Sequence, residues 1–149
     1  MTLGGLQPNK SERIMMGHDK KRILVIEDDE EMRALLKDFF LEEGLETDSV
    51  SNGSEAFRKL VKESFVLVIT DIRIPGLTGL DILPGIRKLQ PEVPIIVITA
   101  FGSEEIRQRA LEKGATAYLE KPIQFNTLRS LVCEMVYPST NPLSPEGRS

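Results

Sequence analysis

The sequence predicts an α/β protein of the doubly wound class, with a five-stranded parallel sheet between two layers of helices. Short apolar segments alternate five times with segments whose apolar residues recur at helical spacing. The apolar segments lack polar alternation, which is typical of strands buried on both faces. A length of 149 residues suits one domain whose parallel strands are joined by right-handed crossovers.

The first half of the domain is predicted to contain two strands and two helices. Residues 22–26 form a short, nearly all-apolar strand, and the helix that follows over 30–43 ends before Gly44. Residues 45–50 are a weaker strand, expected at a sheet edge, and a second helix covers 54–63. The apolar faces of these two helices comprise Met32, Leu35, Leu36, Phe39, Phe40, Ala56, Phe57, Leu60 and Val61.

The middle of the chain supplies two buried strands, 66–70 and 94–99, separated by a helix over 80–90. The pair Pro84-Gly85 lies inside that helix. Because proline fits only the first helical turn without cost, we expect the helix to start late or to kink.

The last third is predicted to contain two helices around a brief strand. Ser103 is the expected N-cap of a helix over 103–113, and Gly114 ends it. The final strand covers 116–119. The last helix is marked by Phe125, Leu128, Val132 and Met135.

Both ends of the chain have the composition of tails. Residues 1–20 are expected to be a flexible N-terminal tail without a secretory signal, and 138–149 a Pro/Ser-rich tail or linker. The domain therefore spans 21–137. No apolar run approaches the roughly 20 residues that cross a bilayer, so we expect no membrane partner and a cytoplasmic location. The single cysteine, Cys133, excludes an internal disulfide and is expected to be a small core residue.

The formal net charge of −4 argues against direct nucleic-acid binding as the main function. Residues 21–137 hold 15 basic and 20 acidic residues, and five of the acids are consecutive, over 27–31. Without that run the domain would be neutral. The excess negative charge is therefore local.

Polar residues follow several of the predicted strands directly. Glu27 and Asp28 follow the first strand and Asp71 the third, whereas Thr99 ends the fourth and Lys121 lies just past the fifth. Parallel strands deliver these positions to one sheet edge, where such folds bind ligands. Clustered carboxylates require a cation, and oxygen ligands without His or Cys suit magnesium. A carboxylate with a free oxygen can attack phosphorus, while a lysine and a hydroxyl hold phosphoryl oxygens.

Each of these residues also has a simpler interpretation. Asp29 and the two acids after it fit the first turn of a helix, where the helix dipole favours negative charge, and we assign them to that role. Asp71 could be a turn residue, Thr99 a strand end and Lys121 a surface residue. Their joint occurrence at corresponding strand ends favours a site.

Four segments resemble the receiver domain of two-component response regulators over about residues 21–137. They are ILVIEDD (23–29), TDIRIPGLTG (70–79), PIIVITA (94–100) and GATAYLEKP (114–122). All four occur in the order and at the spacing of that family. The resemblance implies a flavodoxin-like (βα)5 fold with strand order 2-1-3-4-5.

The resemblance also implies a role for individual residues. Asp71 would be the phosphoacceptor, which attacks the phosphorus of a donor phosphohistidine to give an aspartyl phosphate. Asp28 and Asp71 would bind Mg2+ (Mn2+ being an alternative), with Glu27 acting through water and the backbone carbonyl of Arg73 completing the protein ligands. Lys121 would contact a phosphoryl oxygen.

Further residues resemble the family's switch. Thr99 would turn toward the phosphoryl group, and Tyr118 would swing inward as Thr99 moves. The bond between Lys121 and Pro122 is expected to be cis. The switched surface would include the fourth helix, the fifth strand and the fifth helix.

Two bulky residues lie where the family is variable. Arg73 lies two positions after the phosphoacceptor, and Phe101 two after Thr99. We expect them to shield an aspartyl phosphate from water and to slow its hydrolysis. Gln124, where an acid often caps the last helix, is interpreted as a stability detail, and the lone His18 as a residue of the tail.

The resulting prediction is a regulatory phosphoacceptor, not an enzyme, with only self-catalysed phosphorylation and dephosphorylation. Its expected partners are a sensor histidine kinase or phosphotransfer protein, a downstream effector or absent output domain, and a second copy when phosphorylated. The output could be transcription regulation. Two alternatives remain: a phosphohydrolase of the haloacid-dehalogenase type, which would need an acid where Arg73 stands, and a receiver that is never phosphorylated.

Overall fold

The structure is a computed structural model that describes residues 21–73 and 79–138. Its five parallel strands form one sheet in the order β2-β1-β3-β4-β5, which confirms the predicted fold class and strand order. The predicted tail 1–20, which includes His18, and the predicted tail 138–149 apart from residue 138 lie outside the described residues, as do residues 74–78.

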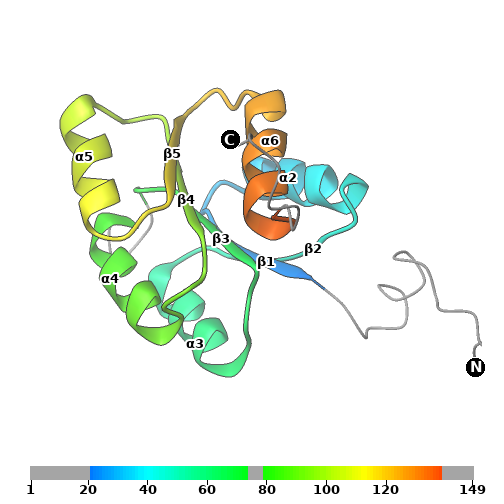
Figure 1. The fold of residues 1–149 in the computed structure, drawn as a ribbon, viewed down its shortest axis with the longest axis horizontal. Helices are drawn as coiled ribbons and strands as arrows, with labels where there is room; N and C mark the ends of the chain where they lie inside the picture. Colours follow the sequence, from blue (N-terminus) through cyan, green and yellow to red (C-terminus); the bar gives the residue numbers. More distant parts are fainter. Residues whose placement is uncertain (1–20, 74–78, 139–149) are drawn as a thin grey trace, which may run out of the picture.

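The elements alternate strictly along the chain (Figure 1). The strands are β1 (Arg22–Ile26), β2 (Glu46–Val50), β3 (Leu67–Thr70), β4 (Ile95–Thr99) and β5 (Ala117–Glu120). The helices are α2 (Glu30–Glu42), α3 (Gly53–Lys62), α4 (Gly79–Leu89), α5 (Glu104–Glu112) and α6 (Phe125–Val136). The predicted ranges agree with these to within about one residue at each end.

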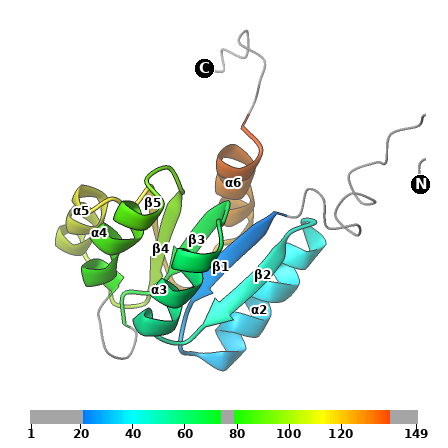
Figure 2. The same ribbon diagram turned by 90° about the horizontal axis from the view of Figure 1, so that it is seen from below.

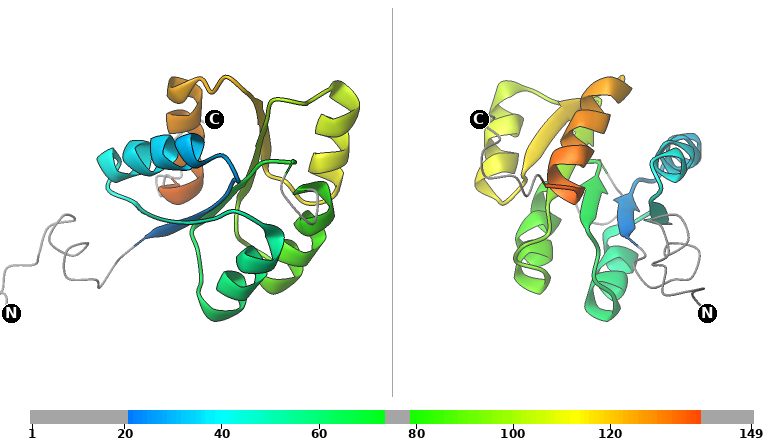
Figure 3. Two further views of the ribbon diagram at one scale, coloured as in Figure 1. Left: turned by 180° about the vertical axis from the view of Figure 1, so that it is seen from behind. Right: turned by 45° about the vertical axis from the view of Figure 1, so that its right-hand side comes forward.

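The sheet separates two hydrophobic cores. Alternate residues of each central strand face opposite sides, so that Leu24 contributes to one core and Val25 to the other. Helices α3, α4 and α5 cover the first core, and α2 and α6 cover the second, as the views from opposite sides show (Figures 1 and 3). Strands β3 and β4 are fully buried, and β1 is buried except for Arg22 at its start, because both of their faces are covered, as the apolar sequences predict.

Local signals set the ends of the helices. The side chains of Asp29, Asn52 and Ser103 cap α2, α3 and α5 by accepting hydrogen bonds from backbone amides in the first turn. Gly44 and Gly114 follow α2 and α5 with φ angles of 81° and 119°, which side chains rarely allow. The predicted capping by Ser103 and the predicted helix ends are confirmed.

Three residues expected in the core are exposed: Leu35 (47%), Val61 (69%) and Cys133. The reason is the same each time. Each lies next to a buried residue on its helix, and successive residues are about 100° apart around a helix axis. The buried neighbours are Leu36, Leu60 and Val132.

The expected late start of the helix around Pro84 is also wrong. Helix α4 begins at Gly79 and continues through Pro84, which lies on its exposed side. The missing N–H therefore removes a hydrogen bond without ending the helix.

The carboxyl ends of the strands lie at one edge of the sheet, as the parallel arrangement in Figure 2 shows. Backbone hydrogen bonds fix that edge beyond the strands themselves. Glu27 donates to Val50, Asp71 to Ile26 (3.1 Å) and Lys121 to Thr99 (2.9 Å). Across the described ranges, 21–73 and 79–138, no helix is long and apolar enough to span a bilayer.

Candidate functional site

Three charged side chains meet at the carboxyl edge of the sheet. The Lys121 ammonium donates to Asp71 Oδ2 at 2.8 Å and to Glu27 Oε1 at 2.9 Å. Lys121 lies 50 positions after Asp71 and 94 positions after Glu27 in the sequence. The ends of β1, β3 and β5 bring the three residues together. Glu27 is 4% exposed and Asp71 6%, so the ion pairs are largely shielded from water.

Backbone groups hold both carboxylates in place. The amide of Arg73 donates to Asp71 Oδ1 at 3.0 Å, and the amide of Asp29 donates to Glu27 Oε2 at 3.1 Å. The Arg33 guanidinium donates to the backbone carbonyl of Glu27 at 2.7 Å. Each carboxylate is therefore oriented by one amide and one ammonium, which presents Asp71 in a fixed position.

Burial and pairing act in opposite directions on the charges. Burial raises the pKa of Glu27, and the hydrogen bond from Lys121 offsets this only in part. Burial alone would lower the pKa of Lys121, but its hydrogen bonds to Asp71 and Glu27 outweigh burial and raise it. The ammonium is therefore strongly favoured, and one positive charge faces two carboxylates.

The remaining negative charge fits a hard cation. The side-chain atoms here that could bind a metal are carboxylate oxygens, which suit magnesium better than a softer metal. We expected the carboxylates of Glu27, Asp28 and Asp71 to converge at this edge, but the structure does not bring all three together. Among residues 21–73 and 79–138 there is no group of three acidic, His or Cys side chains with metal-ligand proximity. Two buried carboxylates and a backbone carbonyl still suit magnesium, because that ion keeps several waters.

Asp28 is the carboxylate that does not join Glu27 and Asp71. It is exposed, whereas Glu27 before it is buried. The backbone bends at Asp28, one residue beyond Glu27, whereas the Glu27 amide still donates to Val50 at the edge of the sheet. Asp28 as a direct metal ligand stays a prediction. The assignment of Asp29 as a helix-end residue is confirmed by its capping bond to the amide of Glu31.

Thr99 is fully buried at the end of β4 and connects to the site through the backbone. Its Oγ1 accepts from the amide of Phe101 at 3.1 Å, and its carbonyl accepts from the amide of Lys121. Tyr118 lies in β5 opposite Val97 and packs against the core beneath α5. The bond between Lys121 and Pro122 is cis, as expected.

Two contacts were not predicted from the sequence. Arg33 looked like an ordinary polar helix residue, and nothing in its spacing marked it as a partner of Glu27. Gly79 is needed for space: a Cβ there would lie 2.7 Å from Ile72 Cα and closer still to the Asp71 carbonyl oxygen. Gly79 lies eight residues after Asp71, but its close approach to the end of β3 can be predicted only once α4 is known to start there.

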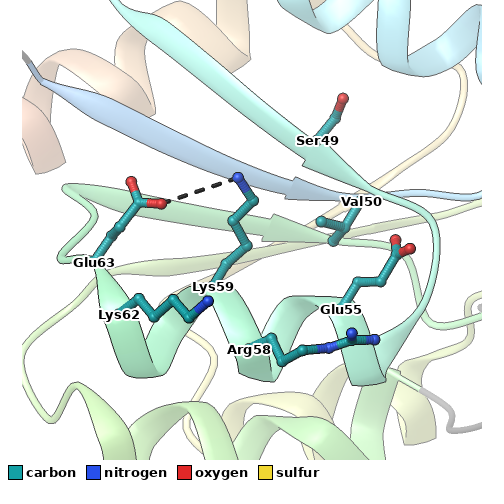
Figure 4. A pocket seen from close by; sticks show the side chains of 7 residues that line it. All are labelled: Ser49, Val50, Glu55, Arg58, Lys59, Lys62 and Glu63. Carbon is teal, nitrogen blue, oxygen red and sulfur yellow. Dashed lines mark ion pairs between the residues drawn. The ribbon is translucent and has the colours of Figure 1, made fainter.

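A hollow lies away from this cluster, between the edge strand β2 and α3 (Figure 4). Its volume is about 460 Å³, and it contains none of the predicted site residues. Lys59 on its wall pairs with Asp48 at 3.4 Å and with Glu63 at 4.0 Å. Arg22 of β1 pairs with the same two carboxylates. These ion pairs attach α3 to the sheet, so we assign them a structural role. Its lining residues are Ser49, Val50, Glu55, Arg58, Lys59, Lys62 and Glu63.

The sequence of the chain is similar to those of known proteins. The family model of the response regulator receiver domain matches residues 23–133. The response regulator protein PilR of Pseudomonas aeruginosa is 36% identical over 113 residues, which cover 76% of this chain and 25% of PilR. Sporulation initiation phosphotransferase F of Bacillus subtilis is 32% identical over 112 residues, covering 75% of this chain and 90% of that protein.

Solved structures agree with the sequence matches. The CheY-like receiver domain protein of Methanospirillum hungatei superposes with a TM-score of 0.76 at 30% identity, covering 79% of this chain and 94% of the other. The chain thus spans about a quarter of PilR but nearly all of phosphotransferase F. Relatives of this kind occur both within longer regulators and as short proteins.

Proposed function

The chain belongs to the response regulator receiver family, and from this premise we propose that Asp71 accepts a phosphoryl group from the phosphohistidine of a sensor kinase or phosphotransfer protein. The observation that carries the proposal is the contact of one ammonium, Lys121, with both Asp71 and Glu27. It joins the candidate nucleophile, which is 6% exposed, to a positive charge at the edge of the sheet. Receiver domains are regulatory phosphoacceptors, and the same regulatory role is proposed for this chain.

In the proposed reaction, a carboxylate oxygen of Asp71 attacks phosphorus. The new P–O bond forms as the P–N bond to the donor imidazole breaks, and the imidazole nitrogen keeps the electron pair and takes up a proton. Phosphoryl transfer depends mainly on positioning and charge neutralisation. The Arg73 amide fixes one oxygen of Asp71, and Lys121 is close enough to follow the phosphoryl oxygens.

Magnesium would be held by Asp28, Asp71 and the Arg73 backbone carbonyl, with Glu27 acting through water, and Mn2+ could replace it. When bound, the ion supplies positive charge against the phosphoryl oxygens. The protein would attract the ion because the two buried carboxylates of Glu27 and Asp71 share a single lysine, which leaves a net negative charge at the site. Self-catalysed phosphorylation and dephosphorylation are part of this proposal.

Phosphorylation would add about −1.5 to −2 charge to the pocket. Thr99 would turn its hydroxyl toward that charge and give up its bond from the Phe101 amide. Tyr118, whose hydroxyl is already buried in this structure, would swing further inward into the space that Thr99 leaves. The readout surface is then α5, β5 and α6, which would bind an effector, an output domain or a second copy of the chain. Control of transcription is one such output, because a relative that is 32% identical over 115 residues, ZraR of Escherichia coli, is named a transcriptional regulatory protein.

The test is labelling with acetyl phosphate in the presence of Mg2+. Wild type is expected to gain one acid-stable, base-labile phosphoryl group, and Asp71→Ala none. Asp38→Ala, which changes an exposed acid on α2, is the matched control and should label like wild type. Equal labelling of Asp71→Ala and wild type would refute the assignment of the phosphoacceptor.

A further inference from the structure

We propose that Gly102 is a positioning residue for Tyr118: the missing side chain at 102 leaves the space that the Tyr118 hydroxyl occupies. The inference rests on the proposed function only in giving Tyr118 a switching role. Its structural part stands on the contacts of these two residues. Any side chain at 102 is predicted to expel Tyr118 from its inward position.

The space between the two residues is fully used. A Cβ on Gly102 would lie inside contact distance of the Tyr118 hydroxyl oxygen, 2.8 Å from Tyr118 Cζ and 3.0 Å from a carboxylate oxygen of Glu120. The two separations from Tyr118 are shorter than real Cβ atoms show, and the separation from Glu120 is tight. The observed orientation of Tyr118 therefore requires that residue 102 has no side chain.

Backbone conformation does not explain the glycine. Within the described residues the glycines with positive φ are Gly44 and Gly114, and Gly102 is not among them. An L-amino acid could adopt its backbone angles without the usual left-handed penalty. The requirement at 102 is therefore for space over the ring of Tyr118.

Tyr118 is the partner that must move when this space is filled. Gly102 lies between two anchored residues: the amide of Phe101 binds Thr99 Oγ1 at 3.1 Å, and Ser103 Oγ caps α5 by accepting from the Ile106 amide at 3.2 Å. The loop is thus fixed on both sides. A tyrosine side chain, in contrast, can rotate about χ1 and move its ring toward solvent.

The inward position of Tyr118 is finely balanced. Its hydroxyl is buried, and among the described residues no group completes a hydrogen bond to it. Burial raises its pKa, the carboxylate of Glu120 adds to this, and the nearby backbone of Ser103 acts in the opposite direction. The ring packs against the core, whereas the buried hydroxyl exchanges its water contacts for the backbone of Ser103 alone, without a hydrogen bond of full geometry. A single added methyl group is therefore enough to shift the balance.

The consequence for switching follows from the position of Gly102 in the chain. It lies three residues after Thr99, on the loop that a turning Thr99 would pull. Movement of that loop changes the space over the hydroxyl, which couples Thr99 to Tyr118 through the backbone at 102. Gly102→Ala would hold Tyr118 outward irrespective of the state of Asp71.

The test measures the exposure of Tyr118 without any phosphorylation, so it is independent of the proposed function. The sequence has two tyrosines and no tryptophan, and Tyr137→Phe leaves Tyr118 as the sole fluorophore of its class. In that background, acrylamide quenching of tyrosine fluorescence is expected to rise about two-fold or more on Gly102→Ala, because the ring population shifts outward. Gly85→Ala is the matched control: its new Cβ meets the Phe57 ring, not a tyrosine, and quenching should not change.

A double variant covers the case in which Gly102→Ala fails to fold. In the Tyr118→Ala background the clash disappears, so adding Gly102→Ala should leave urea unfolding unchanged. Unchanged quenching in Gly102→Ala would overturn the inference. So would an equal loss of stability from Gly102→Ala with and without the Tyr118 ring, because Gly102 would then be needed for another reason.

Discussion

The Arg73 guanidinium carbon lies 4.0 Å from the centroid of the Phe101 ring, which places a cation directly on an aromatic face. The backbone amides of the same two residues bind the side chains of Asp71 and Thr99. The side chains of Arg73 and Phe101 thus join the loops after β3 and β4, while a backbone amide anchors each loop to the end of its own strand. The stacked pair lies next to the carboxylate that we propose as phosphoacceptor.

The stacked pair is predicted to protect the aspartyl phosphate from water. In the double variant Arg73→Ala/Phe101→Ala the phosphoryl group should be lost several-fold faster, up to about ten-fold, which corresponds to about 1.4 kcal/mol of activation free energy. The backbone amides that orient Asp71 and Thr99 remain in this variant. The measurement is the first-order decay of ³²P-labelled protein after removal of the donor.

The control for lost apolar surface is Leu111→Ala, an exposed residue (36%) on α5. Its decay rate should equal that of wild type. If the double variant also decays at the wild-type rate, the shielding role of Arg73 and Phe101 is wrong.

Glu27 is predicted to make stability fall as pH rises. Burial raises the pKa of Glu27 in the folded protein above its ordinary value of 4.5, so the folded state binds more protons than the unfolded chain between that value and the folded pKa. The free energy of unfolding contributed by this residue therefore declines through that window. Lys121 does not interfere, because its raised pKa keeps it charged until the pH exceeds about 10.5.

Urea unfolding at a series of pH values measures this effect in wild type and Glu27→Gln. The free energy of unfolding of wild type minus that of the variant should decrease from about pH 4.5 upward and then level off. A difference that stays constant, or one that increases with pH, would contradict the raised pKa.

Gly79→Ala is predicted to destabilise the fold by about 1–3 kcal/mol or more, as expected for overpacking. The new Cβ would meet backbone atoms of Asp71 and Ile72, which cannot rotate away. The Gly79 amide also donates to the Ile72 carbonyl at 2.6 Å, so the start of α4 is held against the end of β3. Chemical denaturation measures the loss.

Gly85→Ala is the matched change within the same helix. There the added Cβ meets only the end of the Phe57 ring, at 2.8 Å, and alanine improves helix propensity by about 1 kcal/mol. The cost at 85 should therefore be clearly smaller than at 79. Equal costs would show that the close approach at 79 relaxes without penalty.

Much of the fold was predictable because it depends on short-range patterns. The runs of apolar residues marked β1, β3 and β4, and Ser103 and Gly114 marked the ends of α5. Helix faces were predicted less well: a residue one position from the buried stripe, such as Val61, has the right chemistry and the wrong angle. Hydrophobicity alone does not fix the rotation of a helix about its axis.

The candidate site was predictable only as far as strand ends define it. Lys121, Asp71 and Glu27 follow strands, so parallel topology brings them together. Asp28 shares their sequence context but is exposed, and it lies at a bend beyond the buried end of β1. Arg33 and Gly102 act through a carbonyl and through empty space, and neither leaves a sequence pattern.

Arg87 is predicted to be a major stabilising residue far from the site. Its guanidinium donates to three backbone carbonyls: Pro91 at 2.9 Å, Val93 at 2.5 Å and Gly114 at 2.6 Å. These carbonyls belong to the loop after α4, the entry to β4 and the turn after α5, so one side chain joins three connections. Arg87→Ala should lower the free energy of unfolding by about 2–3 kcal/mol, because charged hydrogen bonds to carbonyls are lost.

The neighbouring Lys88→Ala is the control, since Lys88 is exposed and the effect of a surface substitution is usually within about 0.5 kcal/mol. Arg87→Lys should recover little of the loss, because a single ammonium cannot reach three carbonyls that a planar guanidinium connects. Urea midpoints for the three variants decide the matter. Full recovery by lysine would mean that the charge at this position matters, and the forked geometry does not.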